Sequence, residues 1–206
     1  MIEEDFLFKL DKASIDLHNL YLRSISTDLK GSYLFNHNSE LIKILNHYFY
    51  SENDLERHLV NYFKIIVQKR KSVTVKDGIY WLYRSAIASL SKYFRPSIDI
   101  LMTQYYENSL RILQENLNQS LDESTDLLVK IKNGCKQINQ TIKINIGFEG
   151  DKASQEKCKI LLSLSIDSFI NKSESMDSLT SYSPCLEFSK CLIKTIITNT
   201  DLPLTS

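Results

Sequence analysis

The chain has 206 residues, of which 43% are hydrophobic and 24% are charged, with 25 basic and 25 acidic side chains. This composition can fill a packed core and is typical of a globular protein. The net charge of zero lacks the basic excess that most nucleic-acid-binding proteins carry, so we expect no nucleic-acid partner. The five glycines and three prolines are few, which disfavours an all-β or loop-rich fold.

Apolar residues recur at helical spacing along most of the chain, which predicts a mainly α fold of about seven to nine helices. The expected helices cover residues 3–27, 39–50, 52–71, 78–94, 96–118, 120–134, 152–170 and 184–199. Short connections between them favour antiparallel neighbours, and so a multi-helix bundle or an array of helix pairs. We expect a single helical domain, 1–206, which could be divided into two subdomains that meet near 135–150.

Several residues predict where these helices begin and end. Ser51 with Asp54 three residues later resembles a capping box, with Asp in place of Glu. Gly134 is a helix terminator by type, and Asp151 can cap the helix that follows it. Pro184 suits the first turn of the last helix, where its missing N–H costs nothing.

One segment breaks the helical pattern. From Thr141 to Phe148 apolar and polar residues alternate, with Ile142, Ile144 and Ile146 all on one side. A period of two predicts a β-strand, because successive side chains of a strand point to opposite faces. We therefore expect one minor β element near residues 141–148 in an otherwise helical chain.

Residues that could bind a metal or act as catalysts do not form a recognisable pattern. The four cysteines have no CxxC spacing, and the four histidines lie far from them in sequence. The sequence contains no P-loop, no G-x-G-x-x-G, no H-E-x-x-H and no G-x-S-x-G motif. We therefore expect no metal site, no cofactor, no catalytic residues and reduced thiols.

The start of the chain, MIEEDFLFKLDK, is acidic and lacks the apolar core of a signal peptide. No stretch approaches the roughly 20 apolar residues that cross a bilayer. We expect a cytoplasmic protein without a membrane partner.

Two groups of residues are candidates for contact with another protein. The acidic group, Asp122, Glu123 and Asp126, begins the sixth predicted helix. There it either complements the helix dipole or forms an acidic contact surface. The aromatic group lies in the fourth predicted helix: Tyr80, Trp81 and Tyr83. These three rings point in different directions around the helix axis, so packing and partner binding are both open to them.

The order of elements also resembles a known family. WLYRSAIASLSKYF is followed, about fifty residues later, by TIKINIGFEGDKASQEKCKILLSLSIDSFINKSESMDSLTSYSP, which has the order strand, glycine, helix, polar break, short turn and proline. This order resembles the helical immunity proteins of bacterial polymorphic-toxin systems, specifically immunity protein 49-like sequences. The resemblance implies a small cytoplasmic protein that binds a cognate toxin and occludes its active site, with no catalytic residues of its own.

The expected function is therefore non-enzymatic protein binding, most specifically neutralisation of a cognate toxin. A helical adaptor or scaffold subunit of a larger complex is the alternative. An enzyme that assembles acidic residues or histidines only on folding is a third reading.

Overall fold

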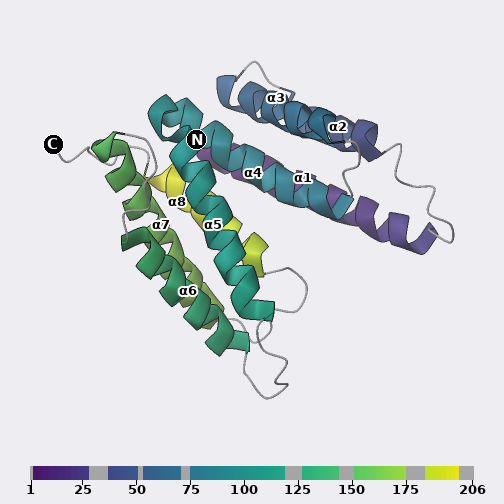
Figure 1. Ribbon diagram of the computed structural model, residues 1–206. Coiled ribbons are helices and arrows are strands. Elements are labelled where there is room, and N and C mark those ends of the chain that lie inside the picture. Colours follow the sequence, from purple (N-terminus) through teal and green to yellow (C-terminus); the bar gives the residue numbers. More distant parts are fainter. Residues whose placement is uncertain are drawn as a thin grey trace. The chain divides into compact units, whose positions relative to one another are not determined.

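The structure is a computed structural model that describes residues 2–27, 37–50, 53–70, 75–118, 127–143, 151–174 and 184–199. These residues form eight α-helices and one 3-10 turn, which confirms the mainly α, helical-bundle fold (Figure 1). The chain divides into two compact units, Met1–Ser89 and Leu90–Ser206. The boundary between these units lies inside α4 (Val75–Phe94).

The N-terminal unit contains α1 (Ile2–Thr27), α2 (His37–Tyr48), α3 (Asp54–Lys69) and most of α4. Helix α1 packs on α2, and α2 packs on α3. Alternating steps of four and three residues place one apolar stripe of α1 in the core: Phe6, Leu10, Ala13 and Leu17. The facing residues of α2 and α3 are equally apolar and buried: Leu41, Leu45, Leu55, Leu59 and Phe63.

Helix α3 begins with a cap that the sequence pattern misplaced. The N-cap is Asn53, whose side-chain oxygen accepts a hydrogen bond of 2.9 Å from the backbone N–H of Leu55. We expected Asp54 at the third helical position, as the partner of Ser51 in a capping box, but it is the first helical residue. Ser51 lies outside the described residues.

The C-terminal unit contains the end of α4, the turn η1 (Pro96–Ile98), α5 (Asp99–Asn118), α6 (Leu127–Lys143), α7 (Lys152–Glu174) and α8 (Pro184–Thr198). Helix α5 packs on α6, α6 on α7, and α7 on α8, and these four helices run alongside one another in Figure 1. Pro184 opens α8 as expected. The buried hydroxyl groups of Tyr106 and Ser189 lie 2.8 Å apart and join α5 to α8.

Two expectations for α6 are wrong. Gly134 does not end a helix but lies buried in the middle of α6. Residues 141–143 belong to the same helix and do not begin a strand, while residues 144–150 lie outside the described part. The reason is a helical stripe that continues through the alternating segment, because its buried residues are three to four positions apart: Ile131, Cys135, Ile138 and Ile142.

The start of α7 follows the sequence prediction. Asp151 accepts hydrogen bonds from the backbone N–H of Ser154 at 2.8 Å and from its hydroxyl at 2.6 Å. These bonds to Ser154 lower the pKa of the Asp151 carboxyl group. Asp151 is therefore the N-cap of α7, with its negative charge at the positive end of the helix dipole.

Candidate partner-binding surface

The three candidate aromatic residues of α4 have different surroundings. Tyr83 is fully buried, and its hydroxyl group donates a long hydrogen bond of 3.4 Å to the Ser14 hydroxyl of α1. Tyr80 is half-buried, and its ring meets the ring of Trp81 edge-on at 4.9 Å between centroids. The structure thus uses Tyr83 to join α1 to α4, and it leaves part of Tyr80 at the surface.

Trp81 is held by positive charges within the chain. Only 5% of the residue is exposed. The guanidinium carbon of Arg70 lies 4.1 Å from the ring centroid of Trp81, and that of Arg84 lies 4.8 Å from it. Each contact is a cation–π interaction of roughly 0.5–1 kcal/mol where water still reaches it. Trp81 therefore joins the C-terminal end of α3 to α4.

The acidic group expected at the start of the sixth helix cannot be placed in the fold. Its three residues lie outside the described residues: Asp122, Glu123 and Asp126. Their contact with a partner stays a prediction from the sequence.

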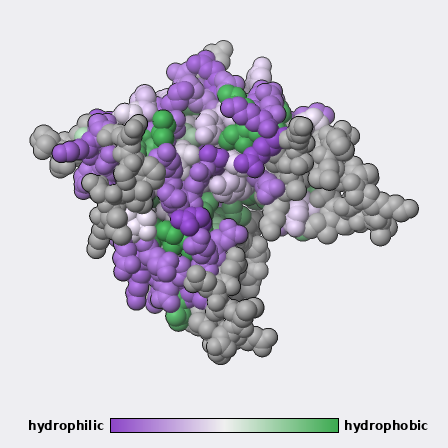
Figure 2. All heavy atoms as spheres, in the orientation of Figure 1, coloured by the Kyte–Doolittle hydropathy of each residue, from purple (hydrophilic) through white to green (hydrophobic). Residues whose placement is uncertain are grey.

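The outer face of α1 carries a second apolar stripe, which we call the α1 outer stripe: Phe8, Ile15 and Leu22. These side chains are 61%, 46% and 50% exposed. They are seven residues apart, or about 10 Å along the helix axis. On the face shown in Figure 2, hydrophobic residues form separate patches in a mainly hydrophilic surface. The alignment of these three side chains on one exposed helix face makes the α1 outer stripe a candidate protein-binding surface.

The sequence contained the signal for this stripe, but the core pattern of α1 concealed it. The buried stripe already accounts for the helical period, so the three other apolar residues look like scatter when each is taken alone. Their common spacing of seven residues is what distinguishes them.

Charged groups link the beginning of α1 to α3. The Lys9 amine lies 2.8 Å from the carboxylates of both Asp5 and Glu56. These hydrogen bonds, first to Asp5 and then to Glu56, raise the pKa of Lys9. Glu56 is buried, so Lys9 supplies the charge that balances its carboxylate. The cluster fixes the orientation of α1 around its axis, and with it the direction of the α1 outer stripe.

A hydrogen bond ties α1 to α2 further along. The Tyr48 hydroxyl donates to the Asp16 carboxylate at 2.5 Å. This bond is the main reason that the pKa of Tyr48 is raised, because ionisation of the phenol would place two negative charges together. The contact reinforces the seating of α1 on α2 beside Ile15 of the outer stripe.

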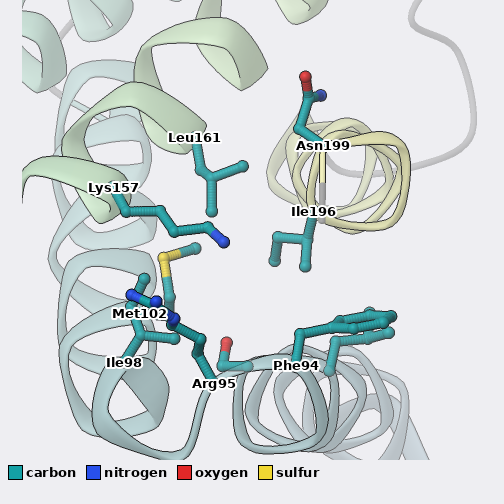
Figure 3. A pocket seen from close by; sticks show the side chains of 10 residues that line it. Phe94, Arg95, Ile98, Met102, Lys157, Leu161, Ile196 and Asn199 are labelled. Carbon is teal, nitrogen blue, oxygen red and sulfur yellow. The ribbon is translucent and has the colours of Figure 1, made fainter. Parts of the chain in front are cut away.

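A small pocket lies in the C-terminal unit (Figure 3). Its volume of about 20 Å³ holds about one water molecule. Apolar side chains including Met102, Leu161 and Ile196 line it, and the amine of the buried Lys157 extends into it. Small-molecule sites usually measure about 300–1,000 Å³, so this pocket is a packing gap and not a substrate site.

The cysteine thiols form no disulfide. Burial raises the pKa of Cys135 to about 12, with a smaller contribution from Asp167. Burial also raises the pKa of Cys158 and, less strongly, that of Cys191. Such thiols stay protonated near neutral pH and are therefore poor nucleophiles and poor metal ligands.

Two further findings concern the part of the chain that the structure describes. No group of three or more His, Cys, Asp or Glu side chains there is arranged to hold a metal ion. None of the helices there is both long enough and apolar enough to cross a membrane.

Comparison of the chain with known protein families, curated proteins and solved structures finds no match.

Proposed function

We propose that this protein acts by binding another protein and catalyses no reaction of its own. The observation that carries the proposal is the α1 outer stripe, with three large apolar side chains 46–61% exposed in one line. Burying such side chains fully stabilises a contact by about 1.5–3 kcal/mol each, so half-exposed ones can contribute a substantial part of that. Asp16 and Glu56 anchor α1 through Tyr48 and Lys9, so the stripe is presented on a preorganised surface.

The more specific role that we propose is that of an immunity protein, which covers the active site of a cognate toxin. The order of elements in the sequence supports this role through its resemblance to immunity protein 49-like sequences. In this proposal the acidic group, Asp122, Glu123 and Asp126, complements a basic toxin surface. The exposed part of Tyr80 adds an aromatic contact.

Protein binding is tested by affinity capture from the native host with wild-type and Phe8→Glu protein as bait. A charge in the stripe leaves the core intact, because Phe8 is 61% exposed, but it makes burial against a partner unfavourable. We expect loss of at least 90% of the captured partner, since about 1.4 kcal/mol changes affinity tenfold. Ile65→Glu, at an apolar position on α3 that is 50% exposed, is the matched control and should retain the partner. Equal capture by all three baits would remove the stripe from the binding surface.

The immunity role is tested by co-expression with a toxin encoded beside the gene for this protein. The wild-type protein should restore growth of cells that express the toxin. Reversing two charges, Asp122→Lys with Asp126→Lys, should leave the circular dichroism spectrum unchanged and weaken toxin binding. Failure of the wild-type protein to protect, despite capture of another partner in the first experiment, would favour the adaptor role over the immunity role.

A further inference from the structure

We propose that the α1 outer stripe pairs with the same stripe of a second copy of this chain, with the two α1 helices antiparallel. This inference rests on the proposed function, because it names the protein that the stripe binds. Two features of α1 carry it: the symmetry of the apolar stripe and the order of the charges beside it.

The stripe is symmetric about its middle residue. Phe8 and Leu22 each lie seven residues from Ile15, and the three side chains have similar exposure. A two-fold axis at Ile15 therefore places Phe8 against Leu22 of the second copy and Ile15 against Ile15. An α-helix drifts only about 20° per seven residues, so the three side chains stay on one face and can be buried together.

The charges beside the stripe favour the antiparallel arrangement. The first half of α1 exposes Glu4, Asp5 and Asp11 together with Lys12, so it is acidic in sum, whereas the second half exposes Arg23. Asp5 and Arg23 are 18 residues apart, which is about five full turns, so they lie on the same side of the stripe. In the antiparallel pair each Asp5 is beside Arg23 of the other copy, and this contact occurs twice. A parallel pair would instead bring the acidic halves together, which opposes association.

These requirements select the second copy over an unrelated protein. A foreign helix would need large apolar side chains at intervals of seven residues and a basic group opposite the acidic half of α1. The outer face of α1 already has apolar side chains at this interval, and Arg23 in its carboxyl-terminal half can lie opposite the acidic side chains of its amino-terminal half. The dipoles of antiparallel helices also attract each other.

The first test is the mass of the purified chain, by light scattering after gel filtration and by sedimentation equilibrium over a wide range of concentrations. We expect a concentration-dependent shift from 23.9 kDa towards twice that mass. Phe8→Glu should weaken dimerisation at least tenfold, and Ile65→Glu should leave it unchanged. A wild-type chain that stays monomeric at every concentration would overturn the inference.

The second test concerns orientation and does not depend on a disruptive substitution. Under mild oxidation, Ile15→Cys should form a disulfide-linked dimer, because the two-fold axis passes beside this position. Phe8→Cys should link poorly to itself but well in a mixture with Leu22→Cys. A parallel pair would give the opposite result, with efficient self-linking of Phe8→Cys, and would overturn the antiparallel arrangement. Ile65→Cys is the control for random collision.

The third test exchanges the charges. Arg23→Asp, which leaves the pair of Asp5 with Lys9 intact, should weaken dimerisation, and Arg23→Asp combined with Asp5→Arg should restore it. No restoration by the double variant would count against the proposed pairing of these side chains. If the wild-type chain is monomeric but Phe8→Glu still loses a captured partner, the second-copy inference fails while the proposed protein-binding function stands. If the chain dimerises through the stripe and captures no other protein, the inference stands and the toxin-binding role fails.

Discussion

At the scale of single residues, tertiary contacts decide which aromatic side chains are available to a partner. Tyr80, Trp81 and Tyr83 lie within one turn of α4 and differ little in chemistry. Ser14 of α1 covers the hydroxyl group of Tyr83, and Arg70 at the end of α3 lies over Trp81. The sequence predicts that these three rings point in different directions, but it does not predict which directions other helices cover.

Burial of the thiols predicts selective labelling of one cysteine. Cys185 is partly exposed, whereas Cys135, Cys158 and Cys191 are buried and have raised pKa values. Because the thiolate is the reactive form, a disulfide reagent at neutral pH should modify about one thiol rapidly in the folded chain. The variant Cys185→Ser should lose this fast phase, and the remaining thiols should react only in denaturant. Rapid modification of several thiols in the folded variant would show that the buried sites open readily.

At the scale of elements, two local patterns competed in α6. The alternation of isoleucines from Ile142 onwards predicts a strand, yet Ile142 is the last buried position of a helical stripe that begins at Ile131. Ile142 fits both periods, and a short segment cannot distinguish them. Packing of α6 on both α5 and α7 favours the helix through Lys143.

Gly134 offers a direct test of this packing. A Cβ atom there would lie 3.5 Å from Cβ of Asn116 and 3.6 Å from Cα of Leu113, which are ordinary contact distances. Gly134→Ala should therefore increase the free energy of unfolding by about 0.5–1 kcal/mol, because alanine favours the helix. Gly134→Leu should lower it by about 1–3 kcal/mol, because α5 leaves no space for a larger side chain. Urea denaturation measures both free energies of unfolding. If Gly134→Ala lowered the free energy of unfolding, the contact between α5 and α6 would be too tight to accept one methyl group.

The ion pairs between α7 and α8 predict a pH dependence. Glu187 accepts from Lys172 at 2.5 Å and lies 3.4 Å from Lys190. Burial opposes ionisation of Glu187, but its contacts with the two lysines outweigh this effect and lower its pKa. A lowered folded-state pKa means that the stabilisation is complete above the unfolded-state value of about 4.3 and is lost as the pH falls through the folded-state value.

Glu187→Gln should accordingly lower the free energy of unfolding at pH 7 by about 1 kcal/mol, since both lysines are partly exposed and water screens the pairs. The difference from wild type should disappear in acid, below the folded-state pKa. Thermal denaturation over a range of pH values measures both effects. Glu115→Gln removes the exposed pair with Arg111 in α5 and should have a smaller effect. A deficit of Glu187→Gln that persists in acid would point to lost packing and not to lost charge.

At the scale of the whole molecule, the chain contains two compact units, each with a core of its own. Leu59 in the N-terminal unit and Leu162 in the C-terminal unit are both fully buried. Replacement of either with alanine should cost about 2–5 kcal/mol, because it removes apolar contacts and leaves a cavity. Most contacts stay within a unit, so the loss should act mainly on the unit that contains the substitution.

Native-state hydrogen exchange can measure this separation. Leu162→Ala should accelerate amide exchange mainly in residues 90–206, and Leu59→Ala mainly in residues 1–89. The amides of α4 are set aside in this comparison, because α4 contains the boundary. Equal acceleration throughout the chain by either variant would show that the two units unfold as one.

Local chemistry in the sequence was sufficient for the helical class, for the cap at Asp151 and for the opening of α8 at Pro184, because each depends on neighbours a few residues away. The same local patterns misplaced the cap of α3 and interpreted Gly134 as a terminator. The position of Gly134 inside α6, like the exposure of Phe8, Ile15 and Leu22, depends on which helices meet in space. A helical period shows that one face is buried, but contacts between residues distant in sequence determine which other face stays open.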